Sequence, residues 1–157
     1  MKKFSITIAG LLAMGALVLQ LRSPQPAKAQ DNPTGCSTST IKGNYGFTMI
    51  GFAGPVGGMV PVATGGRLTF DGGGNLTGSS TNSINGAMSE PQTLSGGYTV
   101  SAGCTGTAWF TPTGPGAGTV HVAMVVLGNG RQIDSLETDT GTTVTGSANL
   151  IGEGQHN

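Results

Sequence analysis

The most regular hydrophobic pattern in the chain lies in residues 65–78. Leu68 and Phe70 alternate with polar neighbours, and this period of two residues is typical of a half-buried β-strand. Asp71 is followed by three glycines and Asn75, residue types that tolerate the positive φ angles of tight hairpin turns. Leu76 then restarts the alternation. The segment therefore predicts a β-hairpin.

The same alternation recurs along most of the chain, between turns rich in glycine, proline and asparagine. A change of parity at Ile50 and Phe52 predicts a bulge there, and Gly65 and Gly66 predict a sharp bend. Residues 85–92 are expected to form a loop. The predicted strands are 41–54, 59–71, 75–83, 93–101, 105–111, 119–127, 131–138 and 142–151.

Strands of this number and spacing predict an all-β fold with antiparallel, sequential neighbours. A meander of about eight strands can close into a single up-and-down β-barrel, which removes the free sheet edges. A β-sandwich is the alternative. The expected organisation is a leader over residues 1–29, an N-terminal arm over 30–40, the barrel over 41–151 and a flexible tail over 152–157.

The leader has the three parts of a secretory signal peptide. Lys2 and Lys3 precede an apolar run from Phe4 to Leu21, and Ala27 and Ala29 form a small-residue cleavage site. We therefore expect cleavage after Ala29 and a secreted or periplasmic location. An uncleaved membrane anchor is the alternative, since the run approaches the length that a bilayer requires.

Charge and cysteine content narrow the possibilities further. Past residue 29 the chain keeps three of its seven Lys and Arg residues and all seven acids, a net charge of −4, which argues against a nucleic-acid partner. Cys36 and Cys104 are the two cysteines, and in an exported chain they are expected to form a disulfide. No further Cys or His lies near them at the spacing of metal ligands, so we expect no metal site and no cofactor.

Two segments carry a resemblance to known proteins. Residues 66–78 (GRLTFDGGGNLTG) and 96–108 (GGYTVSAGCTGTA) resemble a group of small exported bacterial proteins of mostly unassigned function. That group is similar in layout to the calycin-like barrel of allene oxide cyclases and dirigent proteins, so the resemblance implies a calycin-like barrel. It carries over no catalytic residue. Gly103 also stands where the bacterial relatives often have Asp before the cysteine.

A ligand site inside the barrel would draw on the aromatic side chains. Such residues line the mouths of ligand-binding barrels, although ordinary core filling is the favoured explanation for them. Arg67 shares parity with polar residues and is expected outside unless the barrel closes inverted. His121 could point into a cavity or be structural. The candidate lining residues are Tyr45, Phe47, Arg67, Phe70, Tyr98, Trp109 and His121.

Carboxylate chemistry has weaker support. Asp134 and Glu137 are separated by an odd number of residues, so on a regular strand they face opposite sides. Asp139 belongs to a turn. We expect all three to face solvent. If the lumen carries chemistry at all, its likeliest members are His121, Arg67 or Glu137.

The sequence therefore favours an exported, non-enzymatic β-barrel that binds a small apolar ligand or a component of the cell envelope. Two alternatives stay open. One is a structural or adhesive envelope protein, and the other is a cyclase or isomerase acting in the barrel lumen, which only the resemblance supports. The oligomeric state is not predicted.

Overall fold

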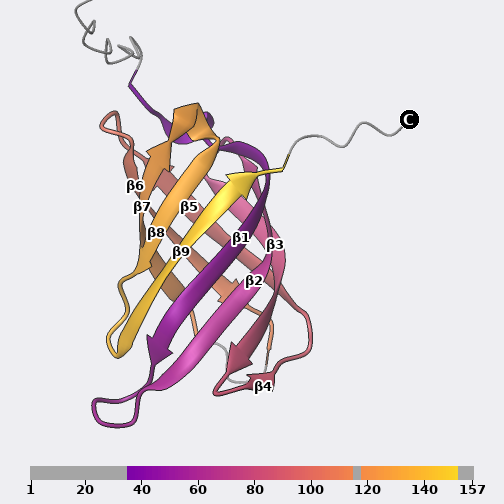
Figure 1. Cartoon of the computed structure of the whole chain (residues 1–157). Coiled ribbons are helices and arrows are strands. Elements are labelled where there is room, and N and C mark those ends of the chain that lie inside the picture. Colours follow the sequence, from indigo (N-terminus) through magenta and orange to yellow (C-terminus); the bar gives the residue numbers. More distant parts are fainter. Residues whose placement is uncertain (1–34, 115–117, 152–157) are drawn as a thin grey trace, which may run out of the picture. The chain divides into compact units, whose positions relative to one another are not determined.

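In the computed structural model, which describes residues 35–114 and 118–151, the chain forms an antiparallel β-barrel (Figure 1). Two short 3-10 helices, η1 (Thr38–Thr40) and η2 (Gly128–Gly130), lie at one end of it. Neither these nor any other helix in the described ranges is long and apolar enough to cross a membrane. The strands are β1 (Lys42–Ala53), β2 (Val60–Asp71), β3 (Asn75–Ile84), β4 (Ala87–Met88), β5 (Gln92–Val100), β6 (Thr105–Pro112), β7 (Val120–Leu127), β8 (Gln132–Glu137) and β9 (Thr142–Leu150).

The barrel closes between its first and last strands. Met49 of β1 pairs with Thr64 of β2 on one side and with Gly146 of β9 on the other. Every other pair in the ring joins neighbours along the chain, with β3 pairing to β5 across the short β4. The prediction of a closed, eight-stranded antiparallel barrel is confirmed, and the sandwich alternative is not adopted.

The additional strand β4 corrects the expectation of a loop over 85–92. Ala87 and Met88 fold back onto Ile84 and Ser83, so they form a short strand beside the end of β3, past its last pair with β5. Asn85 and Gly86 both have positive φ, 49° and 82°, as a two-residue hairpin turn requires. Asn-Gly is the strongest short-range hairpin signal, and it was present in the sequence.

The bulge expected near Ile50 is absent. β1 keeps one continuous register with both neighbours from Tyr45 to Ala53. Ile50 and Phe52 lie on the outer wall and are 65% and 53% exposed, whereas Met49 is buried. The parity change was therefore apparent only, because the outer wall carries hydrophobic residues of its own.

Glycines at several inward-facing positions allow the strands to coil tightly. A Cβ at Gly51 would collide with the carbonyl of Thr143, and one at Gly66 with the carbonyl of Ser79. β2 is unbroken at Gly66, so the predicted bend takes the form of a close approach between strands and not of an interruption. The same collision with a backbone carbonyl of the neighbouring strand would occur at Gly78, Gly96, Gly106 and Gly146.

Two adjacent glycines test this account. We expect Gly66→Ala to lower the free energy of unfolding by about 3 kcal/mol or more, because backbone must move to admit the methyl group. Gly65→Ala is the matched control, since its Cβ would lie 3.8 Å from the nearest atom, Phe47 O, at ordinary contact distance. Its effect should stay within about 1 kcal/mol. Urea denaturation measures both variants, and equal effects would contradict the steric explanation.

Candidate functional site

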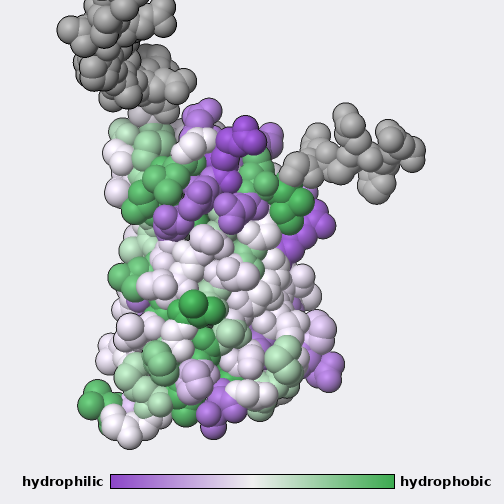
Figure 2. Space-filling view, viewed as in Figure 1, coloured by the Kyte–Doolittle hydropathy of each residue, from purple (hydrophilic) through white to green (hydrophobic). Residues whose placement is uncertain are grey.

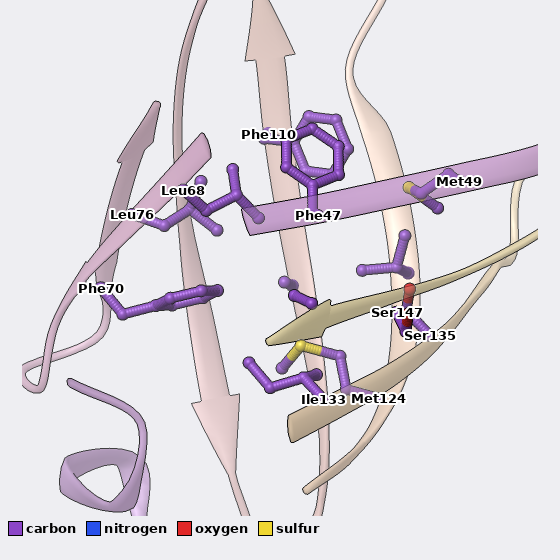
Figure 3. A pocket seen from close by; sticks show the side chains of 13 residues that line it. Phe47, Met49, Leu68, Phe70, Leu76, Phe110, Met124, Ile133, Ser135 and Ser147 are labelled. Carbon is purple, nitrogen blue, oxygen red and sulfur yellow. The ribbon is translucent and has the colours of Figure 1, made fainter. Parts of the chain in front are cut away.

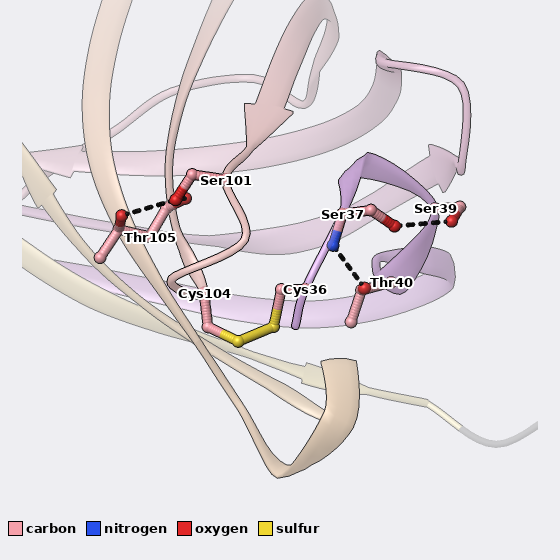
Figure 4. The surroundings of a disulfide bond; sticks show 7 residues. All are labelled: Cys36, Ser37, Ser39, Thr40, Ser101, Cys104 and Thr105. Carbon is pink, nitrogen blue, oxygen red and sulfur yellow. Dashed lines mark hydrogen bonds between the residues drawn. A yellow bond between two sulfur atoms is a disulfide. The ribbon is translucent and has the colours of Figure 1, made fainter. Parts of the chain in front are cut away.

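The segment that precedes β1 lies at one end of the barrel (Figure 1) and is cross-linked to it by a disulfide (Figure 4). Cys36 forms a disulfide with Cys104 in the β5–β6 turn, as the sequence predicted, and its N–H donates to Ala102 O at 3.2 Å. Ile41, the last residue of this segment, has no exposed surface and belongs to the hydrophobic core. The disulfide and Ile41 together fix this segment as a cap.

Three of the candidate lining residues lie together at this end of the barrel, and one of them, Tyr98, bonds directly to the cap. The Tyr98 hydroxyl donates to Ile41 O at 2.8 Å and accepts from Gly72 N at 3.0 Å. The Tyr45 hydroxyl donates to Gly130 O, and Phe70 contacts both tyrosine rings edge-on, with centroids 5.2 and 4.9 Å apart. Burial raises the pKa of both hydroxyls above the usual value. Tyr45 and Tyr98 therefore have a structural role at this end of the barrel.

Below the cap, the barrel interior holds an apolar cavity of about 40 Å³ (Figure 3). Of the predicted lining residues only Phe47 and Phe70 contribute to it. The side chains of Met49 and Met124 contribute their thioethers, and Ser135 and Ser147 are the polar members of the lining. A volume of this size holds one or a few water-sized groups, so the interior is largely filled by its own side chains.

Arg67, Trp109 and His121 lie on the outer wall and do not reach the cavity. Arg67 alternates with the buried Leu68, and Trp109 with the buried Ala108. His121 also faces outward, beside the buried Val122. The seven candidates are thus divided among the cap, the cavity and the outer surface, and no single site unites them.

The outer wall as a whole is weakly polar. Figure 2 shows a face dominated by residues of intermediate hydropathy, with separate hydrophobic spots. Threonine hydroxyls pair across strands on this wall, as at Thr99 with Thr107 (3.2 Å) and Thr111 with Thr119 (2.9 Å). These pairs stabilise neighbouring strands on the solvent side.

In the hairpin turn after β2, the Asp71 carboxylate finds its hydrogen-bond donors within the turn itself. Asp71 accepts hydrogen bonds from Gly73 N at 2.6 Å, Asn75 N at 3.0 Å and Asn75 Nδ2 at 2.6 Å. These bonds, the Asn75 side chain first, lower the pKa of Asp71 to about 2. The turn is a self-contained structure.

The other end of the barrel has no comparable cap in the described residues, and acidic groups gather there. His121 Nδ1 lies 2.8 Å from Asp139 Oδ1, and His121 N donates to Asp139 Oδ2 at 2.7 Å. The bonds from the His121 backbone and side chain lower the pKa of Asp139. The pKa of Glu137, two residues earlier, is shifted in the opposite direction.

Glu137 occupies an inward-facing position of β8 but is only partly buried, so it does not simply face solvent as expected. It lies opposite the buried Val122 and shares the inner face of β8 with Ile133 and Ser135. Burial raises its pKa, the bond from Thr142 opposes this, and the charge of Asp139 adds to it. Of the three ionisable residues considered for lumen chemistry, Glu137 alone occupies an inward-facing strand position, and it is not among the residues that line the cavity. The parity rule separated it correctly from Asp134, but parity alone does not tell which face is inner.

Removing the disulfide should weaken the cap. We expect the double variant Cys36→Ser, Cys104→Ser to lose about 4 kcal/mol of unfolding free energy, because the bond closes a loop across a sequence separation of 68. Urea denaturation against Ser39→Ala, an exposed change in the same segment, measures the loss. A loss below about 1 kcal/mol would show that Ile41 and Tyr98 hold the cap without the cross-link.

The raised pKa of Glu137 predicts a pH-dependent stability. The folded protein holds this proton more tightly than the unfolded chain does, so stability falls as pH rises through the raised pKa. Glu137→Gln should therefore raise the unfolding free energy at pH 7 by about 0.5 kcal/mol, a modest value because water still reaches the carboxylate. The gain should disappear below about pH 4, where both side chains are neutral. Thermal denaturation from pH 3 to 8 measures this, with Asp134→Asn as the control for removing a charge from the same strand.

No protein-family model and no curated protein matches the chain. Among solved structures it is similar to redesigned β-barrels. It shares 20% sequence identity with mFAP1 bound to DFHBI, at a TM-score of 0.50, over 71% of this chain and 96% of that one. For mFAP0 bound to DFHBI the identity is 19% and the TM-score 0.48, over 70% and 98% of the two chains. At this identity the likeness to mFAP1 shows that the chain shares the fold of these barrels.

Proposed function

We propose that the chain is an exported, non-enzymatic β-barrel that binds a small apolar molecule in its interior. The observation that carries the proposal is the apolar cavity between Phe47, Met49 and Met124, sealed at one end by the cap. An apolar space of this kind favours an apolar occupant, since water there finds few hydrogen-bond partners.

The size of the cavity narrows the ligand class. A space of about 40 Å³ admits a slender group such as an alkyl chain more easily than a rigid ring system. Met49 and Met124 are unbranched and flexible, so their side chains can rearrange to lengthen the space. Glu137 and Ser135 lie on the inner face nearer the uncapped end, where the polar group of such a ligand would remain.

Two further observations support parts of the proposal. The redesigned barrel mFAP1 is bound to DFHBI, so a barrel of this fold accommodates a small molecule. The Cys36–Cys104 disulfide suits an oxidising compartment outside the cytoplasm, as the leader over 1–29 predicts. The leader itself lies outside the described residues.

The chain contains its own control for an interior-binding experiment. With ¹³C-methyl methionine labelling, Met49 and Met124 report on the cavity, while Met59 and Met88, 41% and 71% exposed, report on the outer surface. On titration with n-octanol we expect saturable NMR shifts at Met49 and Met124 and none at the other two. Shifts confined to Met59 or Met88, or no shifts, would overturn interior binding.

A matched pair of variants sharpens the result. Ala108 lines the cavity, so Ala108→Val should fill it and weaken octanol binding at least tenfold. Ala123→Val adds the same atoms on the outer wall and should leave binding unchanged. Equal affinities for the two variants would contradict a site in this cavity.

A further inference from the structure

We propose that the outer wall carries a second binding site, a groove beside Trp109 that takes a neutral saccharide. The groove has a volume of about 380 Å³ and runs across β6, β5 and the hairpin turn before β3. Its side chains and backbone come from Trp109, Thr107, Thr99, Gly97, Asn75 and Gly74, among others. The site is independent of the interior cavity, because Ala108 and Phe110 face inward on either side of Trp109.

Trp109 provides a flat apolar surface at this groove. It is the single tryptophan of the chain, and 49% of it is exposed. Its indole lies against Gly97, where a Cβ would be 3.2 Å from Trp109 Nε1. This contact shields the glycine backbone, as aromatic residues often do in sheets. The exposed part of the indole takes no part in this contact and is accessible to a ligand.

Gly97 is buried beneath the indole and supports it, because it has no side chain. A Cβ at this position would also be 3.2 Å from Gly74 O, so even alanine would crowd the floor. The absence of a side chain at Gly97 therefore leaves the space that the indole occupies. Close packing of another group against the backbone is one of the uses of glycine within a strand.

Hydrogen-bonding groups surround the ring and keep unused capacity. Asn75 Nδ2 donates to Asp71, which leaves the Asn75 Oδ1 atom and the second amide hydrogen outside this bond. Thr99 and Thr107 share one hydrogen bond between their hydroxyls, so one hydroxyl hydrogen and several lone pairs of this pair remain for a ligand.

An apolar platform among neutral donors and acceptors fits a saccharide best. The C–H face of a pyranose ring can pack on the indole, while its hydroxyls bond to the amide and the threonine hydroxyls. A purely apolar ligand would leave these polar groups without partners. The residues that line the groove carry no charge, so nothing there selects an anionic ligand such as a nucleotide.

Tryptophan fluorescence tests the proposal directly, because all of the emission comes from Trp109. The full mature chain would be titrated with four neutral hexasaccharides: cellohexaose, maltohexaose, mannohexaose and N-acetylchitohexaose. We expect a saturable change in the emission with at least one of them. No change with any of the four would overturn the proposal. Octanol should not displace the sugar, so this result and the interior-binding result can fail separately.

Two threonine variants separate ligand binding from a structural role. Thr107→Val removes a hydroxyl from the groove and should weaken sugar binding about three- to tenfold. Thr111→Val removes the equivalent hydroxyl from the Thr111–Thr119 pair, on the same face of β6 but outside the groove. It should leave the affinity unchanged. If both variants bind the sugar as the wild type does, the site is not at this groove.

Discussion

The narrow interior of an eight-stranded barrel is the constraint on which the rest of this structure depends. Such a ring leaves room for little more than the side chains that point inward. Large residues such as Phe47 and Phe70 therefore require small partners at the same level, and glycines at positions such as Gly66 and Gly96 supply them. The cavity is the volume that these side chains leave unfilled.

The same constraint separates the two walls. The inner wall takes nearly all of the large buried hydrophobic residues, so the outer wall is rich in threonine, serine and glycine and carries exposed hydrophobic residues such as Ile50, Trp109 and Leu136. Because each side chain belongs to one wall only, the two walls can bind different partners. The apolar interior and the polar groove beside Trp109 are two outcomes of this division.

Most of the fold could be predicted from the sequence, because its alternation is regular and its turns are marked. The hairpin around Asp71, the order of the eight ring strands and the disulfide follow from local patterns and from the cysteine count. The bulge expected at Ile50 was wrong, since a hydrophobic residue on the outer wall looks like a change of face. Glu137 is the opposite case, because a charged residue near the end of a barrel can occupy an inward-facing position and remain partly hydrated.

The candidate site was less predictable, because a list of aromatic residues does not tell which end or wall each one occupies. Tyr45 and Tyr98 are residue types that often line pockets, but here their hydroxyls donate to backbone carbonyls at the capped end, Tyr98 to Ile41 of the cap and Tyr45 to Gly130 of η2. That role depends on the position of Ile41, which reaches the barrel end only in three dimensions. Trp109 belongs to the outer wall because its strand neighbours Ala108 and Phe110 take the interior.

The pairing of β1 with β9 also determines the order in which the barrel can be completed. Tyr45 pairs with Leu150, so the two strands that meet at the seam lie at opposite ends of the described chain. During synthesis, β1 leaves the ribosome long before its second partner exists. Until β9 arrives, β1 presents an unpaired backbone edge that another extended chain could join. The closed ring is thus slow to reach, and once it is reached both edges of β1 are paired.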